Sequence, residues 1–229
     1  MSFVQRLDVR FHETFGDVLK SINWWARFER FTYEGRNNGV RPFAEHILSS
    51  ADRVAVLGVG GDRVVNALWR AKEGRAVEAL RDAGRAEQTD IIILIGLNDV
   101  TAQGRASDVV GGVCALVSEL KAKLCNGVTR VFVLELPLLP MFSPRMRESA
   151  ETINKWLGNI GATGEFIVPK YTSLMDEHGT VMPRWLISRS DVHLNREGYE
   201  VFARFLRSLI IMQGGSKAKL NLFGQHLLQ

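Results

Sequence analysis

Three segments of the sequence carry residues that could act together on a carbonyl group. The glycine-rich segment 58–62 follows an apolar run and should open a helix, where backbone N–H groups can hold an anion. Asn98 follows a second apolar run and could donate a side-chain N–H to the same anion. His193 precedes the last helical pattern and could serve as a general base. These residue types, in this order, predict a site for acyl transfer.

Alternating strands and helices should position these residues. Continuous apolar runs predict strands at residues 53–57, 90–95 and 130–134, with shorter strands near 28–33 and at 165–168. Helical spacing of apolar residues predicts helices at 3–22, 40–50, from 62 onward, and at 106–124, 144–160 and 196–212. Because the central strands are apolar throughout, helices should cover both faces of a parallel sheet. Sites in such sheets lie at the carboxyl ends of the strands.

The composition is that of a folded α/β domain. The chain has 229 residues, 46% of them hydrophobic, with 29 Lys and Arg against 25 Asp and Glu and a net charge of +4. This balance excludes a disordered chain, and no apolar run approaches the roughly 20 residues of a membrane span. Two cysteines are too few for a disulfide framework and favour a reducing compartment. The sequence pI of about 9.3 permits an acidic partner.

The motifs resemble, in order and spacing, those of the SGNH (GDSL-type) hydrolases. Segment 58–62, followed by Leu68-Trp69-Arg70, resembles the second block of that family, and Gly96-Leu97-Asn98-Asp99 resembles the third. Val192-His193-Leu194-Asn195, followed by Gly198-Tyr199, resembles the fifth block. The resemblance runs from about residue 28 to residue 212 and is closest to the catalytic subunits of the intracellular platelet-activating-factor acetylhydrolases.

The resemblance implies both a fold and a chemistry. The fold would be a flavodoxin-like three-layer α/β sandwich around a five-stranded, mainly parallel sheet. The reaction would be hydrolysis of an ester or acetyl group by a Ser-His-Asp triad. Carried over residue by residue, Gly60 would be the oxyanion glycine, with Gly61 the neighbouring alternative, Asn98 the oxyanion amide and His193 the base.

Two positions depart from the family pattern. The segment Gly35-Arg36-Asn37 stands where the family has its Gly-Asp-Ser block, so Asn37 occupies the nucleophile position. Ser190 stands at the acid position, three residues before His193, while Asp191 lies one residue nearer. An asparagine cannot form the acyl-enzyme that a serine forms. We therefore predict a catalytically inactive member of the family, with an active serine-type esterase for acetyl or short-chain esters as the alternative.

Without catalysis, the surface and the extensions would carry the function. We expect residues 1–27 to form a helical extension, 28–212 the hydrolase-like domain and 213–229 a basic tail. The extension, with Trp24, Trp25 and the adjacent Phe28, and the tail would bind other protein subunits of a larger assembly. A lipid-binding or lectin-like use of the former site is a third hypothesis. We expect no cofactor, metal or nucleic acid, and an intracellular location, with cytoplasm and mitochondrion left open.

Overall fold

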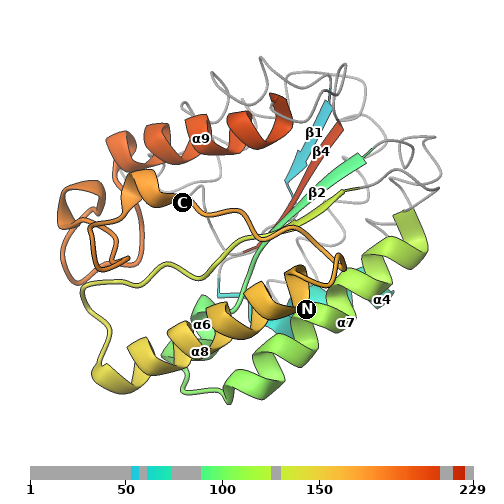
Figure 1. Ribbon diagram of the computed structural model, residues 1–229, viewed down its shortest axis with the longest axis horizontal. Helices are drawn as coiled ribbons and strands as arrows, with labels where there is room; N and C mark the ends of the chain where they lie inside the picture. Colours follow the sequence, from blue (N-terminus) through green and yellow to red (C-terminus); the bar gives the residue numbers. More distant parts are fainter. Residues whose placement is uncertain (1–52, 57–60, 74–88, 125–129, 212–218, 225–229) are drawn as a thin grey trace, which may run out of the picture.

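The computed structural model describes residues 53–56, 61–73, 89–124, 130–211 and 219–224. Within these residues, four strands pair in parallel in the spatial order β1-β4-β2-β3 (Figure 1). Their bounds are Arg53–Val56 for β1, Thr89–Leu94 for β2, Val131–Val133 for β3 and Lys219–Gly224 for β4. The carboxyl ends of all four strands therefore lie at one edge of the sheet.

Strand β2 is buried on both faces, as its apolar sequence predicts. Ile91, Ile92 and Ile93 are each at most 1% exposed. At its amino end, the buried Asp90 accepts a hydrogen bond of 2.7 Å from Nε of Arg130, which immediately precedes β3. This ion pair links the starts of two neighbouring strands and thereby favours their register, in which Ile91 is paired with Val131.

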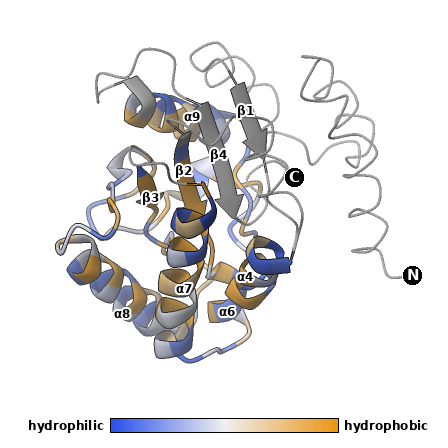
Figure 2. Cartoon of the chain, turned by 90° about the vertical axis from the view of Figure 1, so that its right-hand side faces the viewer, coloured by the Kyte–Doolittle hydropathy of each residue, from blue (hydrophilic) through white to orange (hydrophobic). Residues whose placement is uncertain are grey.

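Helices cover the two faces of the sheet. α4 (Val64–Glu73), α7 (Ala106–Leu124) and α8 (Pro144–Gly161) lie on one face, and α9 (Arg196–Ile211) lies on the other (Figure 1). Figure 2 shows these helices from the side, with apolar residues along α7 and α8. The three-layer α/β sandwich is confirmed. None of the helices in the described part of the chain combines the length and the hydrophobicity that spanning a membrane requires.

Two expectations about the sheet need correction. Residues 213–229 were expected to be a tail, but Lys219–Gly224 form β4 between β1 and β2. The alternation of Leu220 and Leu222 with Lys219 and Asn221 is a local strand pattern, whereas the place of β4 in the sheet depends on pairing with distant segments. The strand expected at 165–168 is reduced to a parallel bridge between Ile167 and Phe132. The described residues thus contain four strands and four isolated bridges, of which this is one. The segments expected at 3–22, 28–33 and 40–50 lie outside the described residues.

The contact between α4 and α7 depends on a glycine. A Cβ added to Gly112 on α7 would lie 2.5 Å from Cγ1 of Val64, which is the buried first residue of α4. The neighbouring Gly111 faces open space, where an added Cβ meets nothing within 4 Å. This close approach fixes the start of α4, and therefore the loop that precedes it, against the rest of the domain.

These two glycines make a matched pair for testing the helix contact. Gly112→Ala should lower the free energy of unfolding by about 1–3 kcal/mol, because α4 must move away from α7. Gly111→Ala should raise it by roughly 0.5–1 kcal/mol, since alanine is the better helix former and no contact is disturbed. Urea unfolding of the two variants measures both effects. Equal changes in the two variants would contradict the contact.

Candidate functional site

The turn after β2 is built around a glycine with positive φ. Gly96 has φ +114° and precedes the short helix α6 (Leu97–Thr101). A Cβ at this position would also lie 3.0 Å from Cγ1 of Val109 on α7, so both the backbone conformation and the space favour glycine. The turn places Asn98 and Asp99 in the first turn of α6, at the carboxyl end of β2.

Asn98 and Asp99 connect this turn to the loop that precedes α4. The Asn98 side-chain amide donates a hydrogen bond of 2.9 Å to the backbone carbonyl of Asp62. Oδ2 of Asp99 accepts one of 3.1 Å from the backbone N–H of Val64, at the N-terminus of α4. The structure thus brings together the second and third sequence blocks. The sequence analysis did not predict that Asp99 accepts a hydrogen bond from the first residue of α4. The available signal was its position directly after Asn98.

Two carboxyl groups lie in this connection, Asp62 buried and Asp99 partly buried. Asp62 is 6% exposed and forms an ion pair with Arg70, one and a half turns along α4. Burial raises the pKa of Asp62, while the charge of Arg70 acts in the opposite direction. Burial also raises the pKa of Asp99, which the hydrogen bond from Val64 partly offsets. Each carboxyl group is engaged within the protein, Asp62 with Arg70 and Asp99 with the backbone N–H of Val64.

His193 lies on a short hairpin that leads into α9. Leu186 and Leu194 form an antiparallel bridge, and the backbone N–H of Ile187 donates to the carbonyl of His193 at 3.1 Å. At the base of the hairpin, the side-chain oxygen of Asn195 accepts a hydrogen bond of 2.9 Å from the N–H of Gly198 in the first turn of α9. The hairpin thus holds His193 on a fixed backbone.

The imidazole of His193 is paired with Asp191. Its Nδ1 lies 2.6 Å from Oδ1 of Asp191, and the same oxygen accepts the backbone N–H of His193 at 2.9 Å. Burial acts to raise the pKa of Asp191, but the two hydrogen bonds from His193 outweigh it and the pKa lies below its ordinary value. Because Nδ1 is engaged by the carboxylate, Nε2 is the ring nitrogen that remains for another partner.

Asp191, not Ser190, is therefore the carboxylate partner of His193. Sequence spacing places Ser190 at the acid position, but its side chain is exposed and its hydroxyl lies 3.2 Å from that of Ser188. The physical reason is local. An aspartate readily accepts the N–H two residues further along, and this turn directs the Asp191 carboxylate back to the ring. The doubt about the orienting group that sequence spacing raises is resolved in favour of Asp191.

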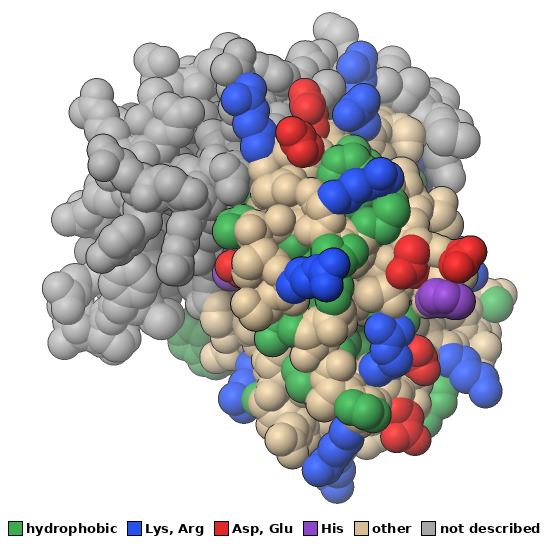
Figure 3. Space-filling view, turned by 90° about the vertical axis from the view of Figure 1, so that its left-hand side faces the viewer, with side chains coloured by type: hydrophobic (Ala, Val, Ile, Leu, Met, Phe, Trp, Pro, Cys, Tyr) green, Lys and Arg blue, Asp and Glu red, His purple; other side chains and the backbone are tan. Residues whose placement is uncertain are grey.

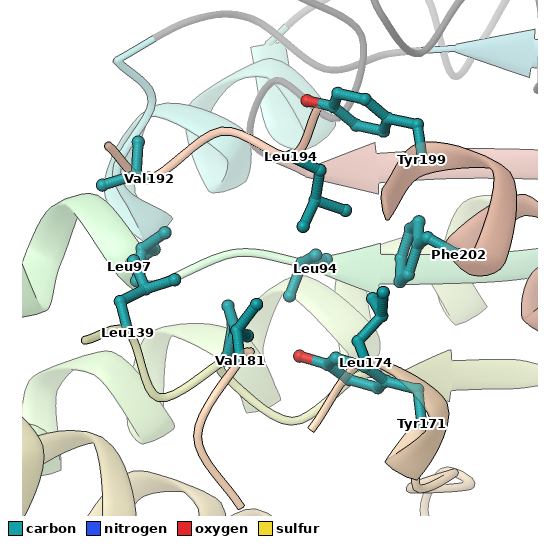
Figure 4. A pocket seen from close by; sticks show the side chains of 11 residues that line it. Leu94, Leu97, Leu139, Tyr171, Leu174, Val181, Val192, Leu194, Tyr199 and Phe202 are labelled. Carbon is teal, nitrogen blue, oxygen red and sulfur yellow. The ribbon is translucent and has the colours of Figure 1, made fainter. Parts of the chain in front are cut away.

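A small apolar cavity lies where the Asn98 turn and the His193 hairpin meet (Figure 4). Leu97, beside Asn98, lines one part of it, and Val192 and Leu194, on either side of His193, line another. Its volume is about 50 Å³. The cavity shows that the third and fifth sequence blocks, which are almost a hundred residues apart, converge on one place.

Of the other predicted site residues Gly60, Gly61 and Asn37, the structure describes only Gly61. Gly61 is exposed and has φ +77°, with open space around its Cα. Gly60 and Asn37 lie outside the described residues. In the described part of the chain, no cluster of three or more His, Cys, Asp or Glu side chains could hold a metal ion. The arrangement that is described can orient an imidazole, hold a proton at its Nε2 and accept an apolar group beside it.

A parallel sheet between two helical layers, with an oriented imidazole at its carboxyl edge, defines a hydrolase-type α/β sandwich. Residues 21–201 match the model of the GDSL-like lipase/acylhydrolase family, and the chain belongs to this family. This confirms the resemblance to SGNH hydrolases that the sequence blocks indicate.

Solved structures of bacterial proteins support the same fold. One from Bacteroides fragilis, assigned as an acylhydrolase, has a TM-score of 0.59 and 18% identity, covering 78% of this chain and 82% of its own. A structure from Parabacteroides merdae, assigned as a GDSL-like lipase, has a TM-score of 0.58 and 18% sequence identity. The match covers 75% of this chain and 80% of that one. A GDSL-like lipase from Bacteroides thetaiotaomicron has a TM-score of 0.52 and 16% sequence identity. The match covers 66% of this chain and 72% of that one. A search of curated proteins gives no significant match.

The pairing of Asp191 with His193 predicts a pH-dependent contribution to stability. A carboxylate whose pKa is lowered by folding stabilises the native state above its unfolded pKa, and this is lost as pH falls through the folded pKa. Asp191→Asn should therefore reduce the free energy of unfolding at about pH 6, and the difference from the wild type should shrink towards about pH 3. Denaturant unfolding across this range measures it, with Ser190→Ala as the control that leaves the profile unchanged. A difference independent of pH would contradict the pairing.

Proposed function

We propose that this chain is a catalytically inactive member of the GDSL-like hydrolase family that serves as a structural or interaction subunit of a larger assembly. The proposal rests on Asn37, which stands where the resemblance to the family places the serine nucleophile. Asparagine lacks the hydroxyl that would form and release an ester intermediate. Loss of the nucleophile leaves only the small residual catalysis that binding and oxyanion stabilisation can supply.

The surroundings of His193 support this proposal. Within the described residues, Asp191 is the hydrogen-bond partner of its ring, and no serine, threonine or cysteine reaches Nε2.

One observation favours the alternative, an active serine-type esterase for acetyl or short-chain esters. The Asp191–His193 pair has the geometry of a general base and its orienting acid, with 2.6 Å between Nδ1 and the carboxylate oxygen. Two of the similar structures are described as GDSL-like lipases and a third as an acylhydrolase. The alternative needs a nucleophile that the first sequence block does not supply.

Hydrolysis assays separate the two functions. For the inactive subunit, purified wild-type protein should hydrolyse p-nitrophenyl acetate and butyrate no faster than His193→Ala, and a fluorophosphonate probe should not label it. An active serine esterase, treated in parallel, shows that the assay and probe work. His178→Ala is the matched control, since that histidine is 78% exposed and does not line the cavity. Turnover that is lost in His193→Ala but kept in His178→Ala would overturn the proposal and establish the alternative.

The subunit role has its own test. Among the described residues on the face shown in Figure 3, basic and acidic side chains are interspersed, so their charge does not indicate the partner. The aromatic residues Trp24, Trp25 and Phe28 make the N-terminal extension the proposed contact. Full-length protein isolated from its native cells should elute in a stoichiometric complex, and a variant lacking residues 1–27 should elute as a free subunit. A full-length protein that is a stable monomer would contradict the role.

A further inference from the structure

The outer side of the helical layer formed by α4, α7 and α8 carries a line of small residues. Figure 2 shows α7 between α8 and α4, and α7 packs against both. Five residues of α7 are exposed, and four of them are small, namely Ser107, Gly111, Ser118 and Ala122. These four follow one another at steps of four, seven and four, so they share one side of the helix. Another helix could therefore approach the α7 backbone closely along this line.

Large apolar side chains stand on the two helices beside this line. Val65 and Trp69 are four residues apart on one side of α4, and they are 65% and 50% exposed. On α8, Trp156 is 39% exposed, although the neighbouring Ile153 and Leu157 are buried. Tryptophan is enriched at contact surfaces, because its large ring gains from burial. We call the four small residues of α7, with Trp69 and Trp156, the outer helix face; its composition suits an apolar helix.

The seam between α4 and α7 carries an acidic residue near one end and a basic residue near the other. The two helices run in the same direction, because Val64 meets Gly112 near their starts and Nζ of Lys123 donates to the carbonyl of Lys72 at 2.6 Å near their ends. Asp108 lies one turn before Gly112, and Lys72 lies eight residues after Val64, so both belong to the seam. Both residues are exposed.

The chain itself contains a segment that matches this face. Residues 3–22 precede the described domain and have the apolar spacing of one side of a helix. The apolar residues are Phe3, Leu7, Phe11, Phe15, Val18, Leu19 and Ile22. Along one edge of this predicted helix, charged residues follow at steps of four, three and four, in the order Arg6, Arg10, Glu13 and Asp17. The first half of the edge is therefore basic and the second half acidic.

Length and side-chain size agree between the segment and the face. Twenty helical residues span about 30 Å, and the 19 residues of α7 span about 28 Å. Phenylalanines at every fourth position would lie over small residues that are likewise four apart. Residues 23–52 can connect either end of the face to Arg53 at the start of β1, because thirty extended residues span about 100 Å.

Charge selects the direction of the segment. Arg10 directly precedes Phe11 on the apolar side, just as Asp108 directly precedes the buried Val109 of α7. In two parallel helices packed towards the same sheet, the charged edge and Asp108 therefore lie on the same flank, towards α4. The basic half of the edge then meets Asp108, which already pairs with the exposed Arg105, and the acidic half meets Lys72. The antiparallel direction would bring like charges together.

We propose that residues 3–22 form a helix that docks on the outer helix face of the same chain, parallel to α7. The tether of thirty residues favours the same chain over a second copy, since it gives an effective concentration of about a millimolar. The docked helix would end beside the C-terminus of α7 and present Trp24 and Trp25 there. That consequence for a partner rests on the proposed function, whereas the docking does not.

Cysteine pairs in the full-length protein test the docking and its direction, with Cys114 and Cys125 replaced by alanine. Phe15→Cys with Ser118→Cys should form an intramolecular disulfide, because the parallel direction places both twelve residues from the helix starts. Leu7→Cys with Ser118→Cys, which the antiparallel direction brings together, should give about a tenth of that yield. Non-reducing gels and intact mass measure both yields.

A charge exchange tests the seam with the same readout. Lys72→Glu should lower the yield of the Phe15–Ser118 cross-link, because it places a second negative charge beside Glu13 and Asp17. Adding Asp17→Lys should restore the yield, since opposite charges then face each other again. A yield that does not respond to either change would contradict the predicted direction.

A matched pair of glycines tests the line of small residues. Gly111→Leu would fill this line, which otherwise holds nothing larger than the serines and Ala122, so trypsin should cleave after Arg10 about tenfold faster than in the wild type. Gly158→Leu on α8 is the control and should leave cleavage unchanged. Both glycines have open space around them, but Gly158 lies about 200° around α8 from Trp156.

The outcomes separate this inference from the proposed function. No cross-link, equal cross-linking of the two pairs, or unchanged cleavage in Gly111→Leu would overturn the docking. Cross-linking into covalent dimers would overturn it too and assign the face to a second copy. None of these measurements involves hydrolysis or a partner. A monomeric protein with the intramolecular cross-link would overturn the subunit role and leave the docking standing, and a stoichiometric complex without it would do the reverse.

Discussion

The burial of β2 on both faces is the constraint on which the site depends. A strand with no exposed face must be covered on both sides, and helices cover this one. Its neighbours β3 and β4 run parallel to it, and parallel strands need crossover connections, which are usually helices. All the carboxyl ends then meet at one edge of the sheet. The ion pair between Asp90 and Arg130 acts at the opposite edge, where it favours the register of β2 against β3.

Given that edge, short-range geometry determines which groups meet there. The positive φ of Gly96 turns the chain so that Asn98 and Asp99 reach the loop before α4, and their hydrogen bonds join the two loops. On the other side of the cavity, the turn at Asp191 brings its carboxylate to the His193 ring. The sheet supplies the location, and these two turns supply the orientation of the side chains.

The sequence predicts the parts of this arrangement that depend on local patterns. Apolar runs locate β1, β2 and β3, helical spacing locates α7, α8 and α9, and the order of the blocks identifies the family. β4 was not predicted, although Leu220 and Leu222 alternate with polar residues as they do in a strand. Its place in the sheet could not be predicted, because it depends on pairing with segments more than a hundred residues away.

The choice between Ser190 and Asp191 as partner of His193 also depends on geometry that the sequence does not contain. The spacing of the blocks gives only positions along the chain, whereas a hydrogen bond depends on distance in space. A turn of two residues can bring a carboxylate to the imidazole as well as the three-residue spacing of the family does. The cavity was beyond sequence reasoning, because its walls come from residues whose apolar character alone would equally suit a filled core.

The two halves of the site differ in what their residues reveal about function. Asn98 and Asp99 form the hydrogen bonds that join the loop before α4 to the turn after β2. These bonds support the fold of this chain whether or not it catalyses a reaction. Their presence therefore does not distinguish an enzyme from an inactive relative. The ring of His193 is partly exposed and bonds to Asp191 on its own hairpin, so it joins no separate elements. Because the imidazole has little structural work in the described fold, its effect on hydrolysis and on ligand binding reports on the site itself, which is why His193 is the residue through which the two functions are best told apart.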